Sequence, residues 1–363
     1  MAQRVLHVGV GVFGRRWCSD FLQSNIADGT IEVVGVVDSD PQALAYGQAA
    51  LKLPDARCFA DAAQAFASVP ADFCTVVVQP AYHEAIIDLA IAHDVDILCE
   101  KPIADTMDAT LRIARKVAAS GRRMAVTMSH RFDQDKTTLR RIVRSGVLGP
   151  INTIGMRFQG DMRQHMAWSS LFRHRMPDPL LIEGAIHHLD IIADFAGARC
   201  RTLYATTWKP AWAEYAGDTD GVVTMTFENG VRAVYEGSVS HPVGLNTFYK
   251  EYIRVDGERG TAILAHRDVE LFMRQDIWRQ QHREGQGQKI ALLQQPKWIN
   301  HWLIEQFARW REGGPVMETR VEENLQASAL VFAAIDSSRS GAPVDVQALV
   351  NGGRSSLSCR TGV

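Results

Sequence analysis

Over residues 1–128, short apolar runs alternate with helix-like segments. The runs that predict strands are Arg4–Val8, Ile31–Val37, Phe73–Val78, Val95–Cys99 and Arg123–Met128. The segments that predict helices are Phe13–Gln23, Pro41–Leu51, Asp61–Ala67, Tyr82–Ala92 and Asp105–Ser120. Strands that alternate with helices of this length predict an α/β fold with a parallel sheet covered on both faces.

The pattern changes after about residue 150, where strand-like runs follow one another. These runs are Ile151–Gln159, Arg201–Thr207, Gly221–Phe227, Val231–Ser238, Tyr252–Asp256 and Ala262–Ala265. Asn229-Gly230 between two of them is typical of a hairpin turn. Helices are predicted near Glu183–Phe195, Trp302–Glu312 and Val321–Ser338. The second half is therefore predicted to hold a mostly antiparallel sheet.

This change of pattern divides the chain into three parts. We expect a cofactor-binding domain over residues 1–128 and a second α/β domain over residues 129–345, for substrate binding and self-association. A tail over residues 346–363 follows, and it is rich in Gly and Ser from Asn351 onward. The 363 residues are enough for two substantial cores.

Composition excludes several classes of partner. The formal net charge is −2, so neither nucleic acid nor an anionic membrane is expected as a partner. The six cysteines form no C-x-x-C pair, which favours reduced thiols and a cytoplasmic protein. No signal peptide is recognised, and no run approaches the roughly 18 apolar residues that a membrane span needs.

A glycine motif opens the first helix. Residues 9–14 read G-V-G-V-F-G, which fits G-x-G-x-x-G between an apolar strand and a helix, as the motif requires. Gly9 permits a tight turn, Gly11 lets the backbone approach a pyrophosphate, and Gly14 allows close helix–strand packing. The backbone amides at the helix start, including those of Val12 and Phe13, would bind the phosphates. The motif therefore predicts a dinucleotide cofactor.

Asp38 ends the second predicted strand, 24 residues after Gly14. A carboxylate there accepts hydrogen bonds from the ribose hydroxyls and repels a 2′-phosphate, so NAD is expected and NADP is less favoured.

Gln79 and Pro80 follow another strand and could line the cofactor site. His83 is either a further cofactor neighbour or a histidine satisfied by the backbone at a helix start.

Glu100-Lys101-Pro102 follows the apolar run Val95–Cys99. Hydride transfer from an alcohol carbon needs a base for the hydroxyl proton, and a partly desolvated lysine near a nicotinamide suits that role. Lys101 is thus the candidate acid/base, and Glu100 could hold the lysine or the nicotinamide ribose. The competing interpretation is a surface turn.

Glu183 and His187 are four residues apart, so on an α-helix they share a face. A carboxylate that accepts from one imidazole nitrogen sets the tautomer of the other, so His187 could relay the substrate proton. One alternative is a metal site of Glu183, His187 and either His165 or His174, although no known ligand spacing supports it. Another alternative is a core helix with satisfied histidines.

These motifs together resemble the glucose–fructose oxidoreductase / inositol dehydrogenase / MocA (Gfo/Idh/MocA) family over nearly the whole chain. The resemblance implies a Rossmann doubly wound parallel sheet followed by an α/β domain with an open, mostly antiparallel sheet. It implies NAD- or NADP-dependent oxidation of sugars, cyclitols and similar polyols, with the catalytic lysine at Lys101 and the histidine at His187. The family often has aspartate where this chain has Glu183. The resemblance also implies a cis Lys101-Pro102 bond and a loop near the nicotinamide at His130-Arg131.

The irregular stretch Asp161–Pro179 offers candidate substrate contacts. Its aromatic and basic side chains suit a sugar ring or an anionic group, and Trp168 and Arg173 are the candidates that join Lys101, Glu183 and His187. Each could instead be an ordinary loop residue.

The run Val222–Phe227 carries apolar or β-branched groups on both faces. Association of two sheet faces is therefore expected, and the family resemblance adds a homodimer or homotetramer.

Three functions are compatible with these residues. The first is an NAD-dependent oxidoreductase that acts on a secondary alcohol of a sugar or polyol. The second is an NAD-dependent glycosidase that uses transient oxidation and produces no net NADH. The third is a non-catalytic sensor that keeps the cofactor fold.

Overall fold

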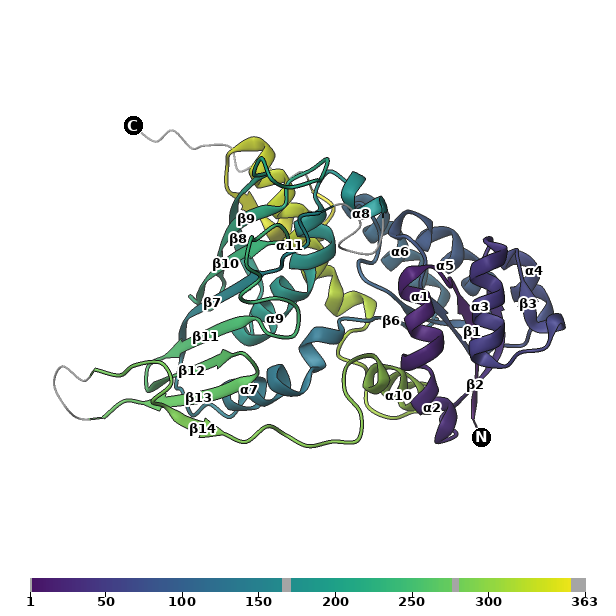
Figure 1. The fold of residues 1–363 in the computed structure, drawn as a ribbon, viewed down its shortest axis with the longest axis horizontal. Helices are drawn as coiled ribbons and strands as arrows, with labels where there is room; N and C mark the ends of the chain where they lie inside the picture. Colours follow the sequence, from purple (N-terminus) through teal and green to yellow (C-terminus); the bar gives the residue numbers. More distant parts are fainter. Residues whose placement is uncertain (1, 165–170, 276–280, 354–363) are drawn as a thin grey trace. The chain divides into compact units, whose positions relative to one another are not determined.

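The computed structural model describes residues 2–164, 171–275 and 281–353, which form two compact units (Figure 1). The first unit comprises the chain up to Ser129 together with Lys297–Leu325. The second comprises the described residues of His130–Pro296 and those from Gln326 to residue 353. The segment Lys297–Leu325 therefore groups with the first unit, whereas the sequence pattern assigned it to the second domain.

In the described part of the first unit, six parallel strands form a sheet in the order β3-β2-β1-β4-β5-β6. The strands are β1 Gln3–Val8, β2 Ile31–Val37, β3 Cys58–Phe59, β4 Phe73–Val76, β5 Asp96–Cys99 and β6 Met124–Val126. The predicted parallel sheet is confirmed. The pattern did not reveal β3, because two residues are too few to show a periodicity.

The helical segments of the first unit are α1 Val12–Arg16, η1 Trp17–Phe21, α2 Gln23–Ala27, α3 Pro41–Leu51, η2 Asp55–Arg57, α4 Ala62–Ser68, η3 Pro80–Tyr82, α5 His83–Ala92, α6 Met107–Ser120 and α10 Ile299–Arg311. The helix predicted over Phe13–Gln23 is interrupted by η1, which is π-helical. The helix predicted from Asp105 begins two residues later, because the hydroxyl of Thr106 caps it by accepting from the amide of Ala109.

Polar contacts attach α10 to this sheet. The Gln3 side chain donates to the carbonyl of Ala308 at 2.7 Å, and Arg311 Nε donates to Asp96 Oδ2 at 2.8 Å. Gln3 and Asp96 both begin strands, so the C-terminal end of α10 contacts the edge opposite the strand ends that carry the glycine motif. These contacts explain why Lys297–Leu325 belongs to the first unit.

In the described part of the second unit, nine strands form a sheet in the order β14-β13-β12-β11-β7-β10-β9-β8-β15. The strands are β7 Ile151–Gln159, β8 Cys200–Trp208, β9 Asp220–Phe227, β10 Arg232–Ser238, β11 Tyr252–Gly257, β12 Gly260–Ala265, β13 Asp268–Met273, β14 Gln288–Ile290 and β15 Val344–Asp345. Among the described strand pairs of this sheet only β7 and β10 are parallel, so the mostly antiparallel prediction is confirmed. The pattern missed β13, β14 and β15.

The helical segments that follow the first sheet are η4 Ser129–Phe132, α7 Gln134–Arg144, α8 Leu171–Arg175, η5 Leu180–Ala185, α9 Ile186–Ala196, α11 Val321–Ser340 and α12 Val346–Val350. Helices α7 and α9 pack against one face of the second sheet (Figure 1). The other face leaves Tyr204, Trp208 and Val234 exposed. The single helix predicted over Glu183–Phe195 is a π-helix, η5, followed by α9.

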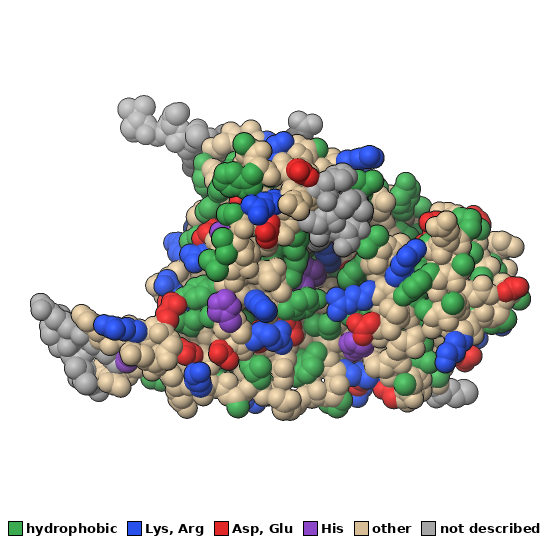
Figure 2. Space-filling model, in the orientation of Figure 1, with side chains coloured by type: hydrophobic (Ala, Val, Ile, Leu, Met, Phe, Trp, Pro, Cys, Tyr) green, Lys and Arg blue, Asp and Glu red, His purple; other side chains and the backbone are tan. Residues whose placement is uncertain are grey.

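The surface carries charges of both signs. Figure 2 shows acidic and basic side chains interspersed on the visible face, in keeping with the small net charge. Within the described ranges, no helix has the length and apolar character needed to cross a bilayer.

Buried charges link α7, α9 and η4 of the second unit. Arg131 Nε donates to Asp190 Oδ2 at 2.9 Å. Asp194 accepts from Arg140 Nε at 2.6 Å and from Arg144 at 2.9 Å, and it also contacts Arg131. Burial opposes ionisation of Asp194, but Arg131 and Arg140 hold the pKa of its carboxyl below the usual value. The carboxylate is therefore charged in the folded unit and holds the arginines in place.

The replacement Asp194→Ala tests this cluster. It removes the carboxylate that the buried guanidinium of Arg140 contacts through two nitrogens, so we expect a loss of about 3–5 kcal/mol in the free energy of unfolding, measured with urea. The control is Glu323→Ala, which removes an exposed ion pair with Arg320 and should cost about 1 kcal/mol or less. Equal, small losses in both variants would contradict the assignment.

Candidate active site

The glycine turn between β1 and α1 has the geometry of a ligand cradle. Gly9 has φ +101°, and a Cβ atom there would lie 2.4 Å from the carbonyl oxygen of Val77. A Cβ at Gly14 would lie 2.1 Å from the carbonyl oxygen of Gly9. Side chains are thus excluded at both positions by backbone. A Cβ at Gly11, by contrast, would meet no described atom within 4 Å, so this side of the turn is open to a ligand.

Beyond Gly11, the first turn of α1 faces solvent, since the side chains of Val12 and Phe13 are both exposed. Among the described residues no side chain caps this helix start. The amides of the first turn are therefore available to a phosphate, and the residues fit the predicted dinucleotide.

Asp38 directly follows β2 and lies beside the same turn. Its Oδ2 accepts a hydrogen bond from the amide of Val10 at 2.6 Å, and its Oδ1 accepts from the amide of Asp40 at 2.9 Å. Both bonds fix the orientation of the carboxylate. A carboxylate has about four acceptor positions, so Asp38 retains capacity for ribose hydroxyls.

Glu100 follows β5 and is buried. Its Oε1 accepts from Trp17 Nε1 at 2.9 Å and from Asn300 Nδ2 at 3.3 Å, while Oε2 accepts from the amide of Lys101 at 3.2 Å. Burial raises the pKa of Glu100, and the charge of Lys101 opposes that rise. Glu100 thus fixes the backbone that carries Lys101. The spacing of the sequence did not identify Trp17 and Asn300 as its partners.

Lys101 itself is half-buried, and the Lys101-Pro102 peptide bond is cis, as the family resemblance implied.

Three further cofactor candidates follow β4. Gln79 and Pro80 lie at the start of η3, and Gln79 is exposed. His83 is buried, with Nδ1 3.1 Å from the carbonyl oxygen of Pro102 and Nε2 3.1 Å from that of Val78. Its surroundings match the alternative interpretation, a histidine satisfied by the backbone.

In the second unit, Glu183 and His187 are both buried. Glu183 Oε2 accepts from Arg173 Nε at 2.9 Å, so two predicted substrate residues form an ion pair. The expected α-helical spacing of Glu183 and His187 is wrong in detail, because Glu183 lies in π-helical η5 and His187 in α9. A π-helix bonds residue i to i+5, which rotates Glu183 relative to His187.

The remaining candidates are Arg131, Trp168 and the two histidines of the alternative metal site. The side chain of Arg131 is engaged with Asp190 and Asp194, as described above, so its guanidinium belongs to a structural cluster. Trp168, a predicted substrate contact, lies outside the described residues, and so does His165 of the alternative metal set. His174 of that set has Nδ1 3.0 Å from the carbonyl oxygen of Glu214.

A buried cluster around Glu251 was missed at the sequence level. His130 Nδ1 lies 3.7 Å and His188 Nε2 lies 3.6 Å from Glu251 Oε1, and the three residues lie close enough together to suggest a metal site. Lys136, however, is fully buried with Nζ 2.7 Å from Glu251 Oε2. This ammonium already neutralises the carboxylate, so the cluster is better described as a buried ion pair flanked by two histidines.

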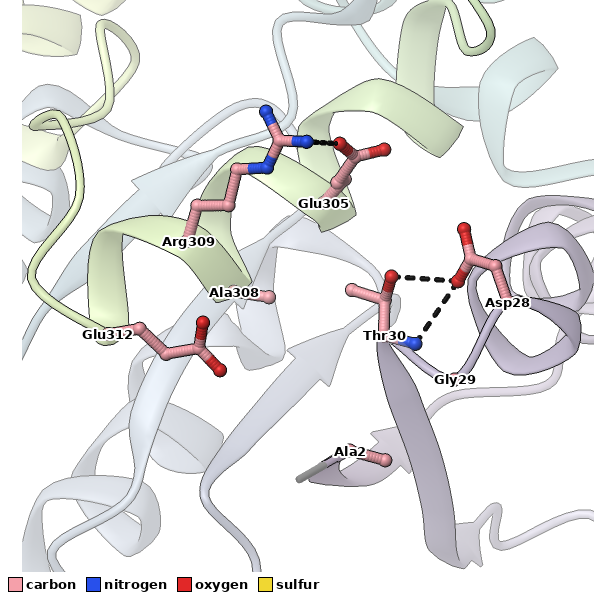
Figure 3. Close-up of a pocket in the computed structure, with 8 residues that line it drawn as sticks. All are labelled: Ala2, Asp28, Gly29, Thr30, Glu305, Ala308, Arg309 and Glu312. Carbon is pink, nitrogen blue, oxygen red and sulfur yellow. Dashed lines mark hydrogen bonds and ion pairs between the residues drawn. The ribbon is translucent and has the colours of Figure 1, made fainter.

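One described cavity of the first unit lies elsewhere. It measures about 470 Å³ and is lined by Ala2, Asp28, Gly29, Thr30, Glu305, Ala308, Arg309 and Glu312 (Figure 3). Ala2 and Thr30 precede β1 and β2, whereas Gly9 and Asp38 follow these strands. The cavity is therefore at the opposite edge of the sheet from the glycine turn. Its acidic groups are partly paired, with Arg309 contacting Glu305.

The parallel sheet, glycine turn and Asp38 define a Rossmann-type dinucleotide-binding unit. The family described as "Oxidoreductase family, NAD-binding Rossmann fold" matches residues 3–128, and its "C-terminal alpha/beta domain" matches residues 140–346. The chain belongs to this Gfo/Idh/MocA oxidoreductase family and carries its NAD-binding domain.

Similar proteins support this placement. "Uncharacterized protein y4oX" of Sinorhizobium fredii is 57% identical over 348 residues, covering 96% of each chain. An inositol 2-dehydrogenase of Pseudarthrobacter chlorophenolicus is 29% identical and covers 63% of this chain and 67% of that protein. An oxidoreductase of Agrobacterium radiobacter, solved with NAD+, L-tartaric acid and magnesium, shares the fold with a TM-score of 0.80 and 21% identity, covering 96% of this chain and all of that one. The chain is thus related to sugar and polyol dehydrogenases.

Asp38→Asn tests the cofactor preference. The amide oxygen can still accept from Val10, but the charge is lost, so we expect the ratio of kcat/KM for NAD over NADP to fall about 10- to 100-fold. Asp88→Asn is the control, since Asp88 is an exposed residue of α5 that pairs with Lys116, and it should leave the ratio unchanged. An unmodified protein that uses NADP more efficiently than NAD would contradict the argument.

Proposed function

We propose that this protein is an NAD-dependent dehydrogenase that oxidises a secondary alcohol of a sugar, cyclitol or related polyol. The observation that carries the proposal is the register of the first sheet. Val8 pairs with Val37 and with Val76, and Val76 pairs with Cys99, so these strands end level with one another. The residues that follow, Gly9, Asp38 and Glu100-Lys101, therefore lie along one edge of the sheet.

On this proposal, the edge would bring an acid/base group to a cofactor cradle. The turn at Gly9 and the first amides of α1 would bind the pyrophosphate, and Asp38 would bind the adenosine ribose. Bound NAD supplies the hydride acceptor. Lys101, anchored through its amide by Glu100, would take the hydroxyl proton in oxidation and return it in reduction. The name inositol 2-dehydrogenase, given to one relative, supports a polyol substrate.

The second unit would supply the other polar groups of the reaction. We assign His187 the role of assisting Lys101 by holding the reacting hydroxyl. Glu183 and Arg173, which form an ion pair, would bind neighbouring substrate hydroxyls through their remaining donors and acceptors. Arg131 would act indirectly, by fixing the start of the second unit through Asp190.

Lys101→Ala tests the acid/base assignment. A panel of polyols and sugars is first screened with NAD by NADH absorbance, and net NADH distinguishes a dehydrogenase from a glycosidase that returns the hydride. On an accepted substrate, loss of the general base should lower kcat about 10²- to 10⁴-fold. The control is Lys116→Ala, which removes a partly exposed lysine paired with Glu84 and Asp88 and should leave kcat unchanged. Full turnover by Lys101→Ala would refute the assignment.

We further propose a homodimer or homotetramer formed through the open sheet face of the second unit. Pairing aligns Tyr204, Thr224, Val234 and Gly155 in a row across four strands. Tyr204 and Val234 are 39% and 44% exposed, whereas Val223 on the opposite face is fully buried. A face that combines exposed apolar and β-branched groups is suited to pair with a second copy.

Val234→Glu tests this association. A charge in the centre of an apolar interface should shift the molecular mass toward the monomer in light scattering, because two carboxylates would be buried unpaired. Val316→Glu changes a valine that is exposed in the first unit and should leave the mass of the assembly unaltered. A monomeric unmodified protein at micromolar concentration would remove the proposal.

A further inference from the structure

The ring of His187 lies flat against the ring of His130. Their centroids are 3.9 Å apart and the planes differ by 9°. Both side chains are at least nine-tenths buried. Such a parallel contact restricts rotation of His187 about its side-chain bonds, because any tilt would force the two rings into overlap.

His130 is itself held on several sides. The rings of Phe248 and Tyr249 lie 5.4 Å and 4.9 Å from its centroid, and Glu251 Oε1 is 3.7 Å from its Nδ1. Glu251 in turn is fixed by Lys136 Nζ at 2.7 Å, and Lys136 also contacts Asp133 at 3.3 Å. The position of His130 therefore depends on a buried ion pair.

The same neighbouring groups determine whether His130 and Glu251 are charged. Burial lowers the pKa of His130 to about 3; Glu251 and Asp133 oppose that shift, and Lys136 and His188 reinforce it. Burial opposes ionisation of Glu251 as well, but Lys136 holds the pKa of its carboxyl well below the usual range. Near neutral pH, His130 is thus uncharged, and it adds no like charge to a His187 that gains a proton.

We propose that His130, set in place by the buried Lys136–Glu251 ion pair, is a positioning residue that fixes the plane of the His187 ring during the reaction. This inference rests on the proposed function, in which His187 holds the reacting hydroxyl. His130 acts only through His187, by directing the nitrogen atoms of that ring. A hydrogen bond to a reacting group depends steeply on such orientation.

A double-mutant cycle tests the inference. His130→Ala removes the flat neighbour and should lower kcat/KM about 10- to 100-fold, whereas His130→Phe keeps a flat ring and should restore most of the activity. His187→Ala should lower kcat/KM about 10²- to 10⁴-fold. In the variant with both positions changed to alanine, the loss should equal that of His187→Ala alone, because a positioning residue has nothing left to position.

Two outcomes would overturn the inference in distinguishable ways. If the losses of His130→Ala and His187→Ala multiply in the double variant, His130 acts independently of His187 and the inference fails while the proposed role of His187 stands. If His187→Ala is fully active, the proposed role of His187 fails and the inference fails with it. His93→Ala, which removes an exposed histidine stacked on Phe66, is the control and should change neither value.

A spectroscopic measurement covers variants that fold poorly. Imidazole ¹⁵N NMR reports the tautomer of His187 in the unmodified protein and in His130→Phe. We expect one dominant tautomer in both, and averaged signals in His130→Ala or, if that variant does not fold, in His130→Asn. If the His187 signals of the variant without a ring at position 130 are not averaged and equal those of the unmodified protein, the inference is refuted.

Discussion

The parallel register of the first sheet is the constraint on which the cofactor site depends. Val8, Val37, Val76 and Cys99 are aligned by backbone hydrogen bonds, so the next residue of each strand leaves the sheet at the same level. A shift of one residue in a single strand would move Asp38 or Glu100 by about 3.3 Å and turn its side chain to the other face. The site is therefore positioned mainly by main-chain pairing, and its side chains add local bonds such as that from Val10 to Asp38.

Much of the first unit could be predicted from sequence because its signals are local. The glycine motif, the helix start at Pro41 and the strand ends each occupy a few adjacent residues, and the structure reproduces Ile31–Val37 and Pro41–Leu51 as predicted. The link from α10 to Gln3 and Asp96 could not be predicted in this way. It joins residues more than 200 positions apart, and a helix period does not show which sheet the helix will cover.

The second unit shows a different limit. Lys136 and Glu251 look like ordinary surface charges in the sequence, since such residues are almost never fully buried without a partner. Their pairing across 115 positions, and its effect on His130, depends on tertiary packing that brings α7 beside the start of β11. The histidine pair at 187 and 188 was visible in the sequence, but the ring that stacks on His187 was not. Buried charge networks are thus the part of a site that single-sequence patterns miss most readily.

The described chain contains two π-helical segments, one in each unit. Within them the side-chain spacing of an ordinary α-helix does not apply. In η1, the extra residue per turn accompanies Trp17, whose indole N–H donates to Glu100. In η5, it accompanies Glu183, which accepts from Arg173. A π-turn rotates the side chains that follow it relative to an α-helix of the same sequence, and such turns are frequent at functional sites. In the second unit the irregular turn therefore rotates His187, which follows it, relative to Glu183, and the same irregularity removes the 3.6-residue period by which sequence analysis placed the two residues on one face.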